Sequence, residues 1–157
     1  MSSKYSLDSP AYALEGGRVL SMTDLLDYFR QHGSLRVSDL HLKISSPPIY
    51  RVDGCLQKMK GPPLTTETMG KLVESLLTNL EMEELKEKRS ADSSCMTETM
   101  QFRLNVFYEN DGLAVAVRAL EAAAPRVEDI GFPNGVWRDL VSKQHGLVLV
   151  TGITGAG

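Results

Sequence analysis

The sequence predicts an α+β fold for most of the chain, followed by the beginning of an α/β fold. Two pairs of segments alternate apolar and polar residues around turn residues, which is typical of antiparallel hairpins. Segments with apolar residues at helical spacing lie before the first pair and between the two pairs. An unbroken apolar run, Gly146 to Val150, then follows a stretch rich in small residues and proline. Such a run is typical of a strand buried on both faces in a parallel sheet.

The chain starts with a segment of low order and then a helix. Residues 1–20 contain Ser, Gly and Pro without a hydrophobic period, so we expect a flexible extension. Ser21 and Asp24 form a capping signal, and Gly33 ends the helix. The apolar residues between them recur at i, i+3, i+4 and i+7: Met22, Leu25, Leu26 and Phe29.

The first hairpin is preceded by one more strand. Residues 38–44, SDLHLKI, alternate in polarity and predict a half-buried strand. Pro47-Pro48 interrupts it. Residues 49–52 and 55–59 then flank Asp53-Gly54, a strong two-residue hairpin signal.

The middle of the chain is expected to be helical. After Gly61, Thr65 or Thr66 caps a helix with one apolar stripe: Met69, Leu72, Val73, Leu76 and Leu77. We expect residues 81–89, EMEELKEKR, to continue it as a solvated, charged helix. Residues 90–99 indicate a loop or the approach to a strand.

The second hairpin carries two arginines. Residues 102–107 and 113–120 flank the turn residues 110–112. With a loop of two or four residues, the numbers of paired positions add up to an odd number. A four-residue loop, Glu109 to Gly112, aligns the apolar residues on one face and puts Arg103 directly opposite Arg118 on the other. A three-residue loop would separate the two arginines onto different faces.

Two interpretations of this arginine pair stay open. Like charges on directly paired residues are unfavourable by up to ~1 kcal/mol. An anion such as phosphate, or an acidic partner, between Arg103 and Arg118 would offset the repulsion. Alternatively, both side chains point to water and splay apart, or pair with Asp or Glu from elsewhere.

The last part of the chain ends in a glycine-rich segment. Residues 122–133 predict a linker, and Asn134 can cap a short helix. The strand expected at Gly146–Val150 runs into TGITGAG, in which Gly152 and Gly157 occupy the two glycine positions of a phosphate-binding loop, G-x-x-x-x-G-K-[ST]. Glycines let successive N–H groups point at phosphate oxygens. We interpret the ending as a cut inside such a loop, one residue before its lysine; the alternative is a flexible Gly/Thr tail.

Composition excludes several classes of function. Seventeen basic and 20 acidic residues give a net charge of −3, which argues against a general nucleic-acid or anionic-membrane binder. Cys55 and Cys95 are too few for a disulfide framework and indicate a reducing, cytosolic setting. No apolar run approaches the ~20 residues of a membrane helix, and no signal peptide is visible. The three histidines lack metal-ligand spacing, so we expect no metal site.

Four motifs together resemble the secretion-type hexameric ATPases, and most of all the type IV pilus retraction ATPases that drive twitching motility. They are Ser38–Gly54, Gln101–Phe107, Ala114–Leu120 and Gly146–Gly157. The resemblance implies a PAS-like N-terminal domain over residues 21–121, an antiparallel sheet with flanking helices. After the 122–133 linker, it implies that residues 134–157 are the truncated first helix and strand of a RecA-like α/β ATPase domain.

The resemblance also implies a function. Such ATPases form cytoplasmic homohexamers, peripheral to the inner membrane, which act with the platform protein of the pilus machine. ATP and Mg²⁺ bind between the two domains. Arg103 and Arg118 match arginines that contact the phosphates. The partial loop supplies Gly152, Thr154, Gly155 and Gly157. No catalytic residue is expected in this fragment, which should not hydrolyse ATP or bind it tightly, insert into the membrane or bind nucleic acid.

Some features depart from the family pattern, and alternative functions remain open. Relatives often have arginines where this chain has Gln101 and near Asp111, so the chain could be a divergent paralogue with weaker nucleotide binding. A stand-alone PAS-like ligand-binding or regulatory module is the main alternative, and it would need an enclosed apolar pocket in residues 34–120. A third possibility is a pilus-extension or type II secretion motor. Those relatives usually carry an additional N-terminal domain, and the region before Ser21 is short, which argues against this possibility.

Overall fold

The computed structural model describes residues 6–32, 36–98, 100–110, 112–120, 127, 134–149 and 151–152. The chain divides into two compact units, Met1–Ala122 and Ala123–Gly157. None of the described helices is long and apolar enough to cross a membrane.

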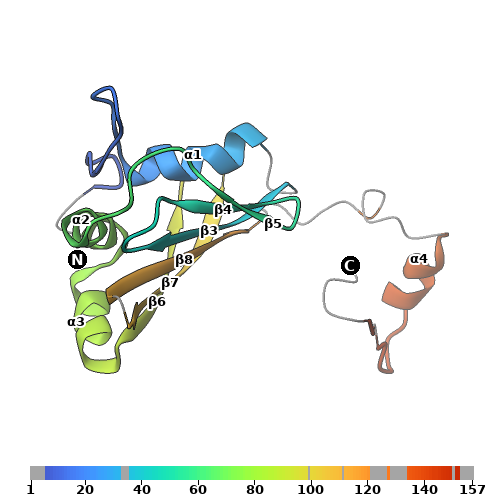
Figure 1. Cartoon of the computed structure of the whole chain (residues 1–157). Helices are drawn as coiled ribbons and strands as arrows, with labels where there is room; N and C mark the ends of the chain where they lie inside the picture. The colour runs from blue at the N-terminus through green and yellow to red at the C-terminus, as the bar shows by residue number, and fades with distance from the viewer. Residues whose placement is uncertain are drawn as a thin grey trace. The chain divides into compact units, whose positions relative to one another are not determined.

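The first unit is built on a six-stranded antiparallel sheet with the order β5-β4-β3-β8-β7-β6 (Figure 1). Its strands are β3 (Val37–Lys43), β4 (Ile49–Val52), β5 (Cys55–Lys58), β6 (Ser90–Met96), β7 (Gln101–Glu109) and β8 (Gly112–Leu120). Its helices are α1 (Met22–His32), α2 (Thr66–Leu76) and α3 (Asn79–Lys88). The expected fold class, a PAS-like antiparallel sheet with flanking helices, is confirmed.

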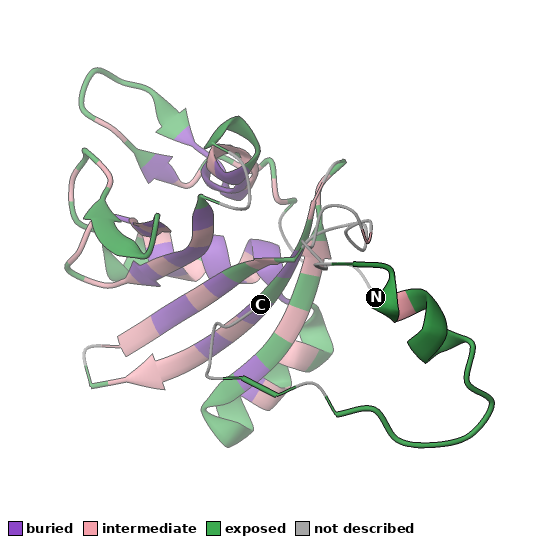
Figure 2. Ribbon diagram, turned by 90° about the vertical axis from the view of Figure 1, so that its right-hand side faces the viewer, coloured by how far each residue is buried: buried purple, intermediate pink, exposed green. Residues whose placement is uncertain are grey.

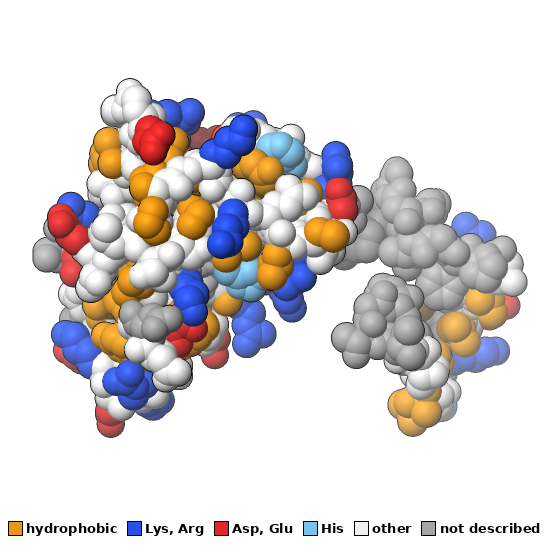
Figure 3. Space-filling view, in the orientation of Figure 1, with side chains coloured by type: hydrophobic (Ala, Val, Ile, Leu, Met, Phe, Trp, Pro, Cys, Tyr) orange, Lys and Arg blue, Asp and Glu red, His pale blue; other side chains and the backbone are white. Residues whose placement is uncertain are grey.

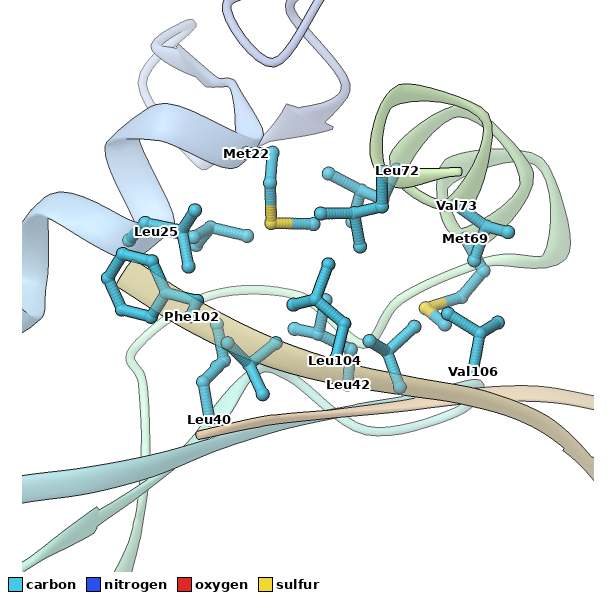
Figure 4. Close-up of a cluster of buried hydrophobic side chains, with 14 of the residues drawn as sticks. Met22, Leu25, Leu40, Leu42, Met69, Leu72, Val73, Phe102, Leu104 and Val106 are labelled. Atoms are coloured by element: carbon cyan, nitrogen blue, oxygen red, sulfur yellow. The ribbon is translucent and has the colours of Figure 1, made fainter. Parts of the chain in front are cut away.

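One face of this sheet carries the hydrophobic core. Side chains of α1 and α2 point at the inward residues of β3 and β7, as Figure 4 shows for Met22, Leu72, Leu42 and Leu104. Leu104 and Met22 are fully buried. Along β4 and most of β7 the buried residues alternate with more exposed ones (Figure 2). The alternation therefore separates a covered face, which packs on the helices, from an open face on the other side of the sheet.

Both hairpins have the predicted register. Asp53 and Gly54 adopt φ of 48° and 80°, the left-handed values that a two-residue hairpin turn requires. In the second hairpin Glu109 pairs with Gly112, so the loop has two residues and not the four from Glu109 to Gly112, although the register is the same. That register aligns Leu104 with Val117 and places Arg103 opposite Arg118, as predicted.

The predicted helix starts are also confirmed. Asp24 N–H donates to the Ser21 hydroxyl at 3.1 Å, and Ser21 N–H donates to the Asp24 carboxylate at 2.8 Å. These reciprocal bonds form a capping box. Thr65 caps α2 by accepting the Thr68 N–H at 3.1 Å. Gly33, the expected end of α1, lies outside the described residues.

The expected flexible extension over residues 1–20 is wrong for the part that the structure describes. Strands β1 (Tyr12–Ala13) and β2 (Val19–Leu20) form a small hairpin. Tyr12 is 2% exposed, and its hydroxyl donates to the Pro62 carbonyl at 2.6 Å. Gly61 admits this ring, since a Cβ there would collide with the Tyr12 hydroxyl. Two-residue strands are too short to produce a hydrophobic period, which explains why the sequence pattern missed them.

The helical region expected after Gly61 consists of two helices, α2 and α3, with a break at Leu77 and Thr78. Leu77 leaves the helical conformation, and Thr78 begins α3 with a full capping box to Glu81. The local hydrogen bonds of Thr78 thus outweigh helix propensity at this point. Helix α3 is largely solvated, as predicted, with Leu85 as its buried residue.

Residues 90–99 were expected to be a loop or the approach to a strand, but most of them form the edge strand β6. Ser90 to Met96 pair along their whole length with β7. The segment SADSSCM has little β-propensity. Pairing with the apolar strand β7 supplies the order that its own sequence lacks.

The described part of the second unit contains the expected short helix, and residues 146–149 of the expected strand are not in a strand. Helix α4 spans Val136–Val141, and the Asn134 side chain accepts the Val136 N–H at 3.0 Å. Residues 146–149 have no regular secondary structure, and Leu147 is 82% exposed. A strand buried on both faces needs neighbouring strands and covering helices, which the described part of this unit does not supply. Of the 122–133 linker only Val127 is described.

Candidate anion-binding site on the open sheet face

Four charged residues lie side by side across the open face, on four neighbouring strands. Asp39 on β3 is paired with Arg51 on β4 and with Arg118 on β8. Arg118 is paired in turn with Arg103 on β7. We call Arg51, Asp39, Arg118 and Arg103 the arginine row; it carries three positive charges and one negative charge.

Asp39 is the centre of the row's hydrogen bonds. Its Oδ1 accepts the Arg118 Nε–H at 2.9 Å, and its Oδ2 accepts the Arg51 Nε–H at 3.2 Å. The Ser38 hydroxyl donates to Oδ2 at 2.8 Å. The Asp39 side chain is only 9% exposed, so these donors replace the water that a carboxylate needs.

A β-bulge directs Asp39 onto the open face. Val37 pairs with Val52 and Asp39 pairs with Arg51, so two residues of β3 advance against one of β4. Val37 is fully buried in the core, although Asp39, two residues later, faces the arginines. The extra residue is Ser38, whose hydroxyl serves the carboxylate. Bulges of this kind commonly re-aim side chains at functional sites.

The electrostatics keep Asp39 ionised. Burial opposes the charged form, but the hydrogen bonds from Ser38 and Arg118, together with the charge of Arg118, outweigh it and lower the pKa of Asp39 below its usual value. The carboxylate is therefore a permanent negative charge at neutral pH. The row as a whole keeps a net charge of about two positive units.

The two predicted arginines differ in their partners. Arg118 pairs with Asp39, as the second interpretation of the arginine pair predicts for this residue. Arg103 is exposed, and no ion pair or hydrogen bond joins it to another described residue. Arg118 bonds Asp39 through Nε, and its terminal nitrogens have no acceptor among the described residues. Both guanidinium groups thus retain donors for an anion, and that role stays a prediction.

The surroundings of the row are polar with apolar edges. Ser94 on β6 pairs with Arg103, and Asn105 donates to Asp92 at 3.2 Å. Leu56 at one end of the face and Met96 at the other are 58% and 72% exposed. Figure 3 shows Lys and Arg side chains among hydrophobic ones on the surface it displays. Such a mixed surface suits a charged ligand together with a partly apolar partner.

The other predicted site residues are only partly described. Gly152 is described and belongs to the second unit. Thr154, Gly155 and Gly157 lie outside the described residues, so the phosphate loop stays a prediction.

Sequence reasoning gave neither Arg51 nor Asp39 a role at this site. The Asp53-Gly54 turn predicts the pairing of β4 with β5, but not the pairing of β3 with β4 that brings Arg51 beside Asp39. The bulge at Ser38 has no sequence signature.

No group of His, Cys, Asp and Glu among the described residues could hold a metal ion. A hollow of about 650 Å³ lies between the N-terminal segment, α1 and the end of β6. Its lining includes Asp8, Asp27, Arg30 and Glu98. It is therefore not the enclosed apolar pocket that a ligand-binding PAS-like module would need.

Comparison with known proteins identifies relatives. No family model matches the chain. The chain is 30% identical over 139 residues to the type IV pilus retraction ATPase PilT of Pseudomonas aeruginosa, which covers 88% of this chain and 39% of that protein. It is 26% identical over 111 residues to a twitching motility protein of Neisseria gonorrhoeae, which covers 70% of this chain and 29% of that one.

A solved structure agrees. The crystal structure of the pilus retraction motor PilT with bound ADP superposes with a TM-score of 0.69 at 35% identity, over 83% of this chain and 38% of that one. The resemblance to the type IV pilus retraction ATPases is thus confirmed, and the match is to the N-terminal part of such a protein. The chain spans less than two fifths of the length of these relatives.

Proposed function

We propose that this chain is the N-terminal part of a type IV pilus retraction ATPase and that the open face of its sheet serves the nucleotide. In the whole protein, ATP and Mg²⁺ bind between this domain and a RecA-like ATPase domain. The protein acts as a cytoplasmic homohexamer at the inner-membrane platform of the pilus machine. Hydrolysis in that ring drives pilus retraction.

The observation that carries the proposal is the pairing of Arg103 with Arg118. The fold places two guanidinium groups on directly paired residues of one face, where they repel each other. Triphosphate oxygens are strong acceptors for such groups, because bonds between two ionised partners are shorter and stronger than neutral ones. Similarity to PilT, solved with bound ADP, supports a nucleotide as the anion.

The first test is to read the source gene beyond codon 157. We expect Lys and then Ser or Thr, which complete the phosphate loop, and a long α/β domain after them. A stop codon after Gly157 would contradict the proposal and favour a stand-alone PAS-like module without enzymatic activity.

The second test separates retraction from other secretion motors. The whole gene product is expressed in a bacterium that lacks its own retraction ATPase and has therefore lost twitching motility. We expect twitching to return. A protein that hydrolyses ATP but leaves twitching absent would argue for a different motor of the superfamily.

A further inference from the structure

We propose that Asp39 is a positioning residue that holds Arg118 in place for an anion bound between Arg118 and Arg103. This inference rests on the proposed function, since it concerns how the same arginines meet phosphate. It adds a buried carboxylate, of the same sign as the ligand, to the residues on which binding depends.

The geometry of the Arg118 contact supports the inference. Asp39 Oδ1 receives the Nε–H of Arg118 at 2.9 Å, at the inner end of the guanidinium group. The Arg118 side chain is 68% exposed, and no other described residue restrains it by a hydrogen bond. The bond to Asp39 therefore fixes the orientation of the group and leaves its terminal nitrogens available as donors.

The partners of Asp39 make it a stable anchor. Arg51 and Ser38 both donate to Oδ2, so the carboxylate stays hydrogen-bonded on one side whatever Arg118 does. Arg51 is itself held by a bond from its Nη1 to the Gly54 carbonyl at 3.1 Å. The bulge at Ser38 and the hairpin turn at Gly54 thus fix the anchor from the backbone.

Repulsion within the row explains why an anchor is needed. Without Asp39, an exposed arginine opposite another arginine would rotate toward solvent and away from its neighbour. A phosphate would then have to order the side chain on binding, which weakens binding. Asp39 removes that cost in advance.

The effect of Asp39→Asn on anion affinity distinguishes a positioning role from a simple change in charge. Losing a carboxylate makes the face one unit more positive, so charge alone predicts tighter anion binding. Positioning predicts weaker binding. Asp92→Asn is the matched control, because Asp92 lies on the same face, accepts a hydrogen bond from Asn105 and forms no ion pair with a described arginine. It adds the same unit of charge and leaves the row intact.

The experiment titrates inorganic tripolyphosphate into the ¹⁵N-labelled 157-residue chain at low salt and follows the arginine Nε–Hε NMR signals. In the wild type we expect the Arg103 and Arg118 signals to shift on titration, and the Arg118 Nε–H to exchange slowly before any ligand is added. We expect Asp39→Asn to bind about fivefold more weakly and to lose the slow exchange. Asp92→Asn should bind as tightly as the wild type or slightly more tightly.

The possible outcomes separate this inference from the proposed function. Wild-type binding at Arg103 and Arg118, with Asp39→Asn binding equally or more tightly, would overturn the positioning role and leave the nucleotide role standing. Fast exchange of the Arg118 Nε–H in the wild type would overturn the anchor itself. If tripolyphosphate moved neither arginine signal, both proposals would fail.

Discussion

The two faces of the sheet are made by the same strands but differ in burial and charge. On the covered face Leu104 is fully buried and faces apolar side chains of α1 and α2 (Figure 4). One residue earlier on β7, Arg103 faces solvent beside another arginine. The covered face therefore stabilises the fold, whereas the open face keeps Arg103 beside Arg118, whose charge is paired with Asp39. The charge of Arg103, which has no ion-pair partner among the described residues, is the basis of the proposal that the open face binds an anion.

The largest expected difference between the faces concerns leucine truncation. Leu104→Ala on the covered face should lower the free energy of unfolding by about 2–5 kcal/mol, through lost burial and the cavity left behind. Leu56→Ala, the same chemical change at a residue that is 58% exposed on the open face, should change it by no more than about 0.5 kcal/mol. Urea denaturation of both variants measures this. Equal losses would show that the open face is also a packing surface.

A smaller effect is the pH dependence of stability that a buried tyrosine of the covered face, Tyr50, should produce. Burial raises the pKa of Tyr50 far above its usual value, and its hydroxyl donates to the Leu25 carbonyl at 2.8 Å. The folded chain then keeps a proton that the unfolded chain releases near pH 10. The stabilisation is complete below that pH and is lost as the pH rises further. Thermal unfolding between pH 8 and 11 should show a smaller alkaline loss of Tm for Tyr50→Phe than for the wild type, with a cost of about 1 kcal/mol at neutral pH from the lost hydrogen bond.

The smallest difference lies within the open face. Arg103→Gln removes a repelling charge, so the free energy of unfolding should stay constant or rise by up to about 1 kcal/mol. Arg118→Gln also relieves this repulsion but loses the bond to Asp39, and it should be less stable than Arg103→Gln by about 0.5–1 kcal/mol. Chemical denaturation at low salt compares them. A destabilised Arg103→Gln would mean that Arg103 has a structural partner and that its charge does not oppose folding.

The sequence predicted those parts of the fold that local rules determine. The Asp53-Gly54 turn, the capping box of α1 and the register that pairs Arg103 with Arg118 all follow from residue type and spacing. Strand β6 could not be predicted, because SADSSCM becomes a strand only through pairing with β7. The break at Thr78 could have been, since Thr78 and Glu81 have the capping-box spacing inside the expected helix.

The sequence predicted only part of the candidate site, because some of its contacts join strands that are far apart along the chain. The hairpin register identified Arg103 and Arg118, which lie within 15 residues of each other along the chain. Asp39 reaches Arg118 across 79 positions of sequence, and the pairing of β3 with β8 that joins them has no local signal.

ATP hydrolysis by the whole gene product, with either arginine changed, is the decisive test of the nucleotide role of the open face. Arg30→Gln is the control, since Arg30 is exposed on α1, outside the arginine row, and pairs with Asp27. If Arg103 and Arg118 contact the phosphates in the transition state, Arg118→Gln and Arg103→Gln should each lower kcat by about 100-fold or more, while Arg30→Gln leaves it unchanged. Wild-type kcat in both arginine variants would contradict the proposal that the open face serves the nucleotide.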